Sequence, residues 1–188
     1  MMKLMKKIRL HNKDFEVYLP AEKIRARLYE LARRLNTELV NKDIVFLGIL
    51  NGAFIFAADL VRLVDLPCAI SFAKVASYQG DKSTGIVHEL IGIVENLEGK
   101  CVVIIEDIID TGLSMDHLVE LLRKKNPSEI HIATLLFKEE AHIGKTRPDY
   151  TGFVIPNRFV VGYGLDFDGK GRNLEDIYIL SAEAGPVD

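Results

Sequence analysis

One segment restricts the fold of this chain more than any other: a strand-length apolar run that changes within a few residues into a helical pattern. The run CVVII at 101–105 is continuous rather than alternating, which is typical of a parallel strand covered on both faces. A helix is expected near 112–125, ended by Asn126-Pro127, and the strand EIHIATLLF follows at 129–137. This order is that of a right-handed parallel crossover, so the sequence predicts an open α/β sheet.

The first third of the chain predicts a similar unit. Apolar residues recur at helical spacing after Pro20, and the strand DIVFLGIL follows at 43–50. A second helix is expected over 53–64, followed by a strand over 67–78, a polar mobile loop over 79–85 and a strand over 86–94. The stripe of the first helix consists of Ile24, Leu28, Leu31, Leu35 and Leu39.

After residue 138 the pattern changes to short strands and turns, in GFVIP, RFVVGYGLDF and DIYIL. We interpret these as edge strands plus a small covering lobe, a hood built from the N-terminal segment and the region 155–188. With 188 residues, 48% of them hydrophobic, the chain is expected to form one domain spanning 1–188.

The net charge of −3 gives no general attraction for nucleic acid or an anionic membrane. The basic start of the chain is interpreted as a solvated tail, and Cys68 and Cys101 as reduced core thiols. No apolar run approaches the roughly 18 residues of a membrane span, and the first ten residues do not resemble a signal peptide, so a cytoplasmic location is expected. The basic residues at the start are Lys3, Lys6, Lys7 and Arg9.

Three carboxylates, on Glu106, Asp107 and Asp110, follow the central apolar run within five positions. Sites in parallel sheets lie beyond the carboxyl ends of the strands. Exposed backbone N–H groups at the next helix start form an anion site, and Gly112 allows close approach of a phosphate.

Two acids beside a phosphate would repel it, unless they contact its hydroxyls or act through a cation. A sugar phosphate with Mg²⁺ meets this requirement. A simple helix cap with solvated acids explains any one of these residues alone, but one cap needs only one side chain.

The segment VVIIEDIIDTGLS at 102–114 resembles the phosphoribosyl-pyrophosphate (PRPP) binding motif of the phosphoribosyltransferases. Its surroundings are similar to the hypoxanthine-guanine phosphoribosyltransferase family from about Ile8 to Ser181. Four further segments agree in order: GILNGAFIFAADL, VASYQGDKSTG, LLFKEE and FVVGYGLDFDGKGRN. The resemblance implies a type I phosphoribosyltransferase fold, an open, mostly parallel twisted sheet flanked by helices, with a small hood lobe.

The resemblance also implies roles at the donor site. The two acids would lie at the ribose hydroxyls and the metal, the residues from Asp110 onward would hold the 5-phosphate, and Asp110 would act as general base near the purine N7. A pyrophosphate loop, often with a cis peptide after Leu50, and an arginine complete the site. The implied PRPP-binding residues are Glu106, Asp107, Asp110, Thr111, Gly112, Leu113, Ser114, Asn51, Gly52 and Arg172. Some relatives have lysine where this chain has Leu113.

For the purine, the family pattern implies that Lys138 donates to the 6-oxo group, while Phe159 and Val160 hold the base. The resemblance implies that Asp166 would lie at the purine site as a second metal contact, which makes the implied metal set Glu106, Asp107 and Asp166. Ser77 and Tyr78 open a lid over the site. Taken alone, Lys138 and Asp166 would pass for solvated charges and Phe159 for a core residue.

The activity implied is Mg²⁺-dependent transfer of the 5-phosphoribosyl group from PRPP to N9 of a 6-oxopurine, giving IMP or GMP and pyrophosphate in purine salvage, by a homodimer or homotetramer. The five histidines show no metal-ligand spacing with a third partner, and GDKSTG at 80–85 does not match a nucleotide P-loop. Two alternatives remain: a PRPP-sensing regulator that binds nucleic acid, and a receiver-like domain phosphorylated on aspartate. The preferred purine is not determined by the sequence.

Overall fold

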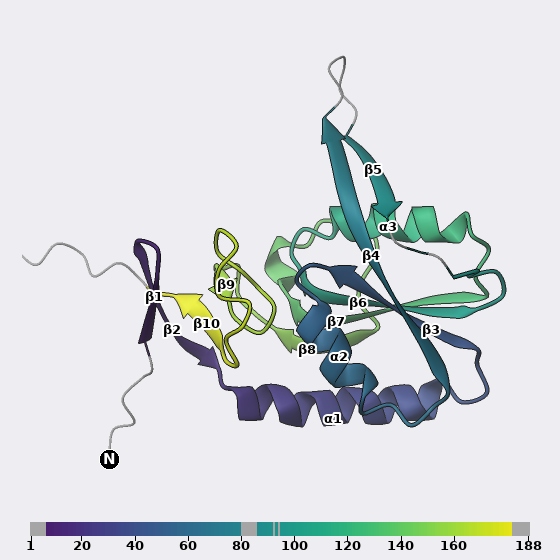
Figure 1. Cartoon of the computed structure of the whole chain (residues 1–188), viewed down its shortest axis with the longest axis horizontal. Helices are drawn as coiled ribbons and strands as arrows, with labels where there is room; N and C mark the ends of the chain where they lie inside the picture. Colours follow the sequence, from purple (N-terminus) through teal and green to yellow (C-terminus); the bar gives the residue numbers. More distant parts are fainter. Residues whose placement is uncertain (1–6, 80–85, 92, 94, 182–188) are drawn as a thin grey trace, which may run out of the picture.

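The computed structural model describes residues 7–79, 86–91, 93 and 95–181. Its main sheet has six strands in the order β5-β4-β3-β6-β7-β8. All neighbouring pairs are parallel except β4 and β5, which form an antiparallel hairpin that projects from the body of the molecule (Figure 1). The strands are β3 (Ile44–Leu50), β4 (Cys68–Gln79), β5 (Ile86–Ile91), β6 (Cys101–Ile109), β7 (Glu129–Phe137) and β8 (Tyr150–Val154).

Helices cover both faces of this sheet, as the continuous apolar strands predict. α1 (Ala21–Glu38) and α2 (Phe54–Val61) lie on one face, and α3 (Leu113–Arg123) lies on the other (Figure 1). Alternate residues of β6 serve the two cores: Val103 and Ile105 pack on the side of α1 and α2, whereas Val102 and Ile104 pack on the side of α3. The expected open α/β sheet is confirmed.

A second, antiparallel sheet has the strand order β1-β2-β10-β9, and thus joins the two ends of the described chain. It lies beside the main sheet (Figure 1) and has a small core of Phe15, Val161 and Tyr178. Asp176 connects it to α1, because its Oδ1 accepts a hydrogen bond from the Ala21 N–H at 2.9 Å. The strands are β1 (Lys7–Leu10), β2 (Lys13–Leu19), β9 (Val160–Val161) and β10 (Ile177–Leu180).

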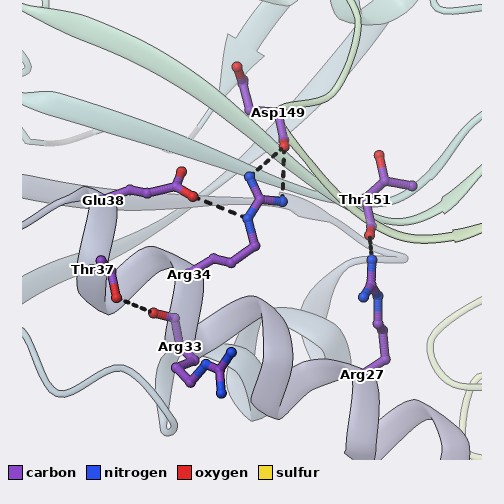
Figure 2. Close-up of polar contacts among 7 residues, drawn as sticks. All are labelled: Arg27, Arg33, Arg34, Thr37, Glu38, Asp149 and Thr151. Carbon is purple, nitrogen blue, oxygen red and sulfur yellow. Dashed lines mark hydrogen bonds and ion pairs between the residues drawn. The ribbon is translucent and has the colours of Figure 1, made fainter.

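Arginines of α1 bind the outermost parallel strand of the main sheet (Figure 2). Arg27 donates to the carbonyl oxygens of Thr151 (2.8 Å) and Gly152 (2.7 Å), and Arg34 lies 3.5 Å from that of Asp149. An edge strand leaves backbone groups unpaired, and these side chains occupy several of them. These hydrogen bonds hold α1 on the sheet in addition to the apolar packing.

Three expectations differ from the structure. The second helix ends at Val61, three residues earlier than predicted, and a turn at residues 62–63 follows it. Cys68 is exposed at the start of β4, where β5 does not yet pair with the strand, whereas Cys101 is buried. Part of the basic start is not a tail, since Lys7 and Arg9 belong to β1.

No helix in the described part of the chain is long and apolar enough to cross a membrane.

Candidate active site

A cleft of about 400 Å³ opens at the carboxyl ends of β3 and β6, where the sequence predicts the site. It is bounded by strand ends of the main sheet and by residues of the segment 159–172, which contains β9 and the turns that follow it. Ten of the predicted site residues line it: Asn51, Gly52, Glu106, Asp107, Asp110, Lys138, Phe159, Val160, Asp166 and Arg172. The remaining lining residues lie within two positions of predicted ones and are Ile49, Leu50, Ile108 and Leu165.

Glu106 and Asp107 lie partly buried in the second half of β6. Burial raises the pKa of Glu106 well above its usual range, and repulsion from Asp107 raises it further. Burial also raises the pKa of Asp107, although hydrogen bonds with Glu106 and the Ile108 N–H and the charge of Arg172 oppose this. The pair is therefore poised to accept a cation, because positive charge would favour both ionised forms.

Carboxylate oxygens are the ligands that Mg²⁺ prefers, so this pair fits the metal implied by the family resemblance. Asp166 could add a third carboxylate. It faces the cleft from the loop 164–172, where its Oδ1 lies 2.7 Å from Arg172 Nη2 and its Oδ2 accepts from the Gly169 N–H at 2.7 Å.

The turn after β3 packs directly against Asp107. The Leu50–Asn51 peptide is cis, as the resemblance implied. A Cβ on Gly52 would lie 1.7 Å from Asp107 Oδ2, and a Cβ on Gly164 would lie 2.1 Å from the Gly52 carbonyl oxygen. Gly164 also has a φ of +101°, which favours glycine. Three chain segments thus meet at this point with no room for side chains.

Lys138 and Asp110 form an ion pair of 2.6 Å between Nζ and Oδ2. The lysine side chain is only 10% exposed, while the aspartate is 48% exposed and open to the cleft. The Lys138 N–H donates to the Ile109 carbonyl oxygen at 2.9 Å, which holds the two strand ends together. A lysine that would pass for a solvated charge in the sequence is therefore a buried group of the site.

Residues 111–114 continue from Asp110 into the start of α3 and do not line the cleft itself. Thr111, Leu113 and Ser114 are exposed, and Gly112 has a φ of +82°. The N-cap residue of α3 is Gly112, which makes no side-chain cap, so the first N–H groups of the helix can donate to an anion. Ser77 and Tyr78 fall within β4, opposite His88 and Val87 of β5, and the expected loop beyond Gln79 lies outside the described residues.

The sequence analysis missed one group of three potential metal ligands, on Cys101, Glu129 and His131, whose ligand atoms lie within 4.8 Å of one another. The sequence signal for it is the i, i+2 spacing of Glu129 and His131, which places both on one face of a strand, whereas the position of Cys101 beside Glu129 follows from the register of β6 and β7. The group lies at the opposite end of β6 from the cleft. Lys42 pairs with Glu129, and hydrogen bonds from Lys42 and His131 lower the pKa of that carboxyl, so its negative charge is already compensated.

Comparisons with known proteins agree with this geometry. The family model described as "Phosphoribosyl transferase domain" matches residues 16–168. The hypoxanthine-guanine phosphoribosyltransferase of Dictyostelium discoideum is 40% identical over 173 residues, covering 89% of this chain and 96% of its own, and that of Aquifex aeolicus is 38% identical over 178 residues, covering 94% and 99%. The chain belongs to the phosphoribosyltransferase family.

The chain is also similar to a solved structure of this family. The crystal structure of a hypoxanthine phosphoribosyltransferase from Staphylococcus aureus superposes with a TM-score of 0.82 at 36% identity, covering 88% of this chain and 91% of the other. The predicted type I phosphoribosyltransferase fold is therefore confirmed.

Proposed function

We propose that this protein transfers the 5-phosphoribosyl group of PRPP to N9 of a 6-oxopurine, hypoxanthine or guanine, in purine salvage. The two relatives compared above are named hypoxanthine-guanine phosphoribosyltransferases, and this chain aligns with nearly their whole length. The observation that carries the assignment is the Lys138–Asp110 pair, because it supplies adjacent donor and acceptor groups in the wall of the cleft.

The edge of a 6-oxopurine matches this pair. Its O6 and N7 lie side by side, so an ammonium can donate to O6 while a carboxylate takes the proton from N7. Lysine is a donor only, and it would meet the 6-amino group of adenine unfavourably. Such buried polar mismatches discriminate strongly between substrates. Lys138 thus selects the purine, and Asp110 acts as general base.

The donor would lie across the carboxyl ends of β3 and β6. Residues 110–114 bind the 5-phosphate, Glu106 and Asp107 bind the ribose hydroxyls, and the turn at Asn51 and Gly52 binds the pyrophosphate with Arg172. Phe159 and Val160 hold the base. A magnesium ion held by Glu106, Asp107 and Asp166 would neutralise charge on the departing pyrophosphate.

Several further features belong to this proposal. The chain is one domain with a hood over the site, Ser77 and Tyr78 begin a lid that excludes water, the protein is cytoplasmic, and it assembles as a homodimer or homotetramer. Light scattering of the purified protein tests the assembly directly.

Product formation with PRPP and Mg²⁺, followed spectrophotometrically for hypoxanthine, guanine, xanthine and adenine in parallel, tests the activity. We expect turnover of hypoxanthine or guanine and none of adenine. Circular dichroism shows whether the purified protein is folded. If a folded protein turned over neither hypoxanthine nor guanine, the proposal would be refuted.

A further inference from the structure

The segment 138–147 packs against the turn that precedes α3. The Thr111 carbonyl oxygen accepts hydrogen bonds from the N–H groups of Ile143 (3.0 Å) and Gly144 (2.9 Å). A Cβ on Gly144 would lie 2.9 Å from the Gly112 carbonyl carbon, so the two backbones touch. The turn that starts the phosphate-binding region is therefore held from outside α3.

A carboxylate adds two more hydrogen bonds. Asp116, in the first turn of α3, accepts from the N–H groups of Lys145 (2.8 Å) and Thr146 (2.7 Å) through its two oxygens. Partial burial acts against ionisation of Asp116, but its hydrogen bonds with Thr146 and Lys145 outweigh this and lower its pKa. The group is a carboxylate at neutral pH, and hydrogen bonds to a charged acceptor are the stronger kind.

The imidazole ring of His142 fills the remaining space beside the turn. A Cβ on Gly112 would lie 2.4 Å from His142 Nε2, which shows how closely the imidazole covers this glycine. The ring donates through Nε2 to the Thr146 carbonyl oxygen at 3.0 Å, and it meets the Phe137 ring edge-on at 5.2 Å. These contacts leave the ring little freedom to move away from the turn.

We propose that Asp116 and His142 are positioning residues that hold the turn 110–112 and the first N–H groups of α3 in the geometry that binds the donor phosphate. This inference rests on the proposed function. The physical reason is that Gly112 has a left-handed conformation and α3 has no side-chain cap, so neither feature restrains the turn from within. The segment 138–147 supplies that restraint.

The same segment begins at Lys138, which contacts Asp110. One continuous stretch of chain therefore sets the purine lysine and the phosphate turn relative to each other. A loss of the contacts at Asp116 is expected to act mainly on the donor, because Lys138 keeps its own backbone bond to Ile109.

Steady-state kinetics of the full chain test the role of Asp116. The Asp116→Ala variant should raise KM for PRPP about tenfold, since each hydrogen bond to a charged group is worth roughly that factor and part of the geometry survives. We expect kcat and KM for hypoxanthine to stay within about twofold, a split that a general loss of structure would not give. Asp116→Asn, which keeps the shape and one acceptor, should lie between wild type and Asp116→Ala.

Glu120→Ala is the matched control, because Glu120 is an exposed acid on the same helix, one turn further along. It should leave KM for PRPP unchanged. A folded Asp116→Ala or Asp116→Asn variant with the wild-type KM for PRPP would overturn the inference, as would equal losses for PRPP and purine.

Hydrogen exchange gives a readout that does not need turnover. The amides of residues 111–114 should exchange faster in Asp116→Ala than in wild type or Glu120→Ala, and unchanged exchange would also overturn the inference. An inactive wild-type protein would refute the proposed function instead, and the exchange comparison would still decide whether Asp116 holds the turn.

Discussion

Gly52→Ala tests whether the acidic pair must keep its position. The added Cβ would lie 1.7 Å from Asp107 Oδ2 and 2.4 Å from its Cγ, whereas real Cβ atoms are essentially never closer than 3.0 Å to such neighbours. The distance has to grow by about 1.3 Å. The Gly52 backbone cannot supply this freely, because its carbonyl oxygen already lies against Gly164.

The carboxylate of Asp107 is therefore the group that moves. A misplacement of about 1 Å in a reacting geometry can lower the rate about 100-fold, so we expect kcat/KM for PRPP to fall by about that factor. The measurement is the initial rate of IMP formation at varied PRPP with saturating Mg²⁺ and hypoxanthine. Melting temperature and circular dichroism show whether the fold survives.

Gly99→Ala is the control for adding a methyl group to a glycine. Gly99 lies before β6, at the opposite end of that strand from the cleft, and apart from its chain neighbours no atom of the described residues lies within 4 Å of the position of its Cβ. Gly99 has a φ of +70°, which is unfavourable for alanine, so the substitution should lower the free energy of unfolding by about 1 kcal/mol without changing kcat/KM. A folded Gly52→Ala protein with wild-type kcat/KM for PRPP would show that Asp107 need not stay in place, and the reasoning would fail.

Three further predictions address the reacting groups and the phosphate turn. Asp110→Asn should lower kcat by at least about 100-fold, as expected for loss of a general base, with little change in PRPP affinity; unchanged turnover would remove that assignment. Lys138→Ala should lower kcat/KM for hypoxanthine by about 10- to 100-fold through loss of a charged hydrogen bond, and unaltered hypoxanthine kinetics would contradict the specificity argument. Asp116 has a pKa below its ordinary 3.8, so its ionised form should stabilise the fold fully above that value and lose this effect as the pH falls through the folded-state pKa. The difference in melting temperature between wild type and Asp116→Asn should therefore narrow from pH 7 to pH 3, and a constant difference would contradict it.

Local pattern was sufficient to predict the main sheet. The strand predicted over 129–137 coincides with β7, and the stripe after Pro20 matches the buried face of α1. The helix is predicted by the strong periodicity of its apolar residues, and the strand by its continuous apolar run, and both patterns are visible in the sequence itself. Helix ends were less predictable, as α2 shows, because its C-terminus has no glycine or proline signal at Val61.

The site divides in the same way. Glu106, Asp107 and Asp110 could be predicted because a parallel sheet brings the carboxyl ends of its strands to one edge. Arg172, Asp166 and Lys138 needed the family resemblance, since each looks like an ordinary surface charge until a distant segment closes over it. The pairing of Lys138 with Asp110 across 28 positions depends on strand order, which no local pattern contains.

Asp116 illustrates why the remaining contacts escape sequence analysis. An acid in the first turn of a helix is common, and its favourable interaction with the helix dipole explains it without any partner. In this structure the same residue accepts two N–H groups from a segment about 30 positions away. Its position on α3 is local information, whereas its partners exist only because β7 returns the chain beside the start of α3. A residue can thus agree with the local preferences of a helix while its main contacts depend on the topology of the fold.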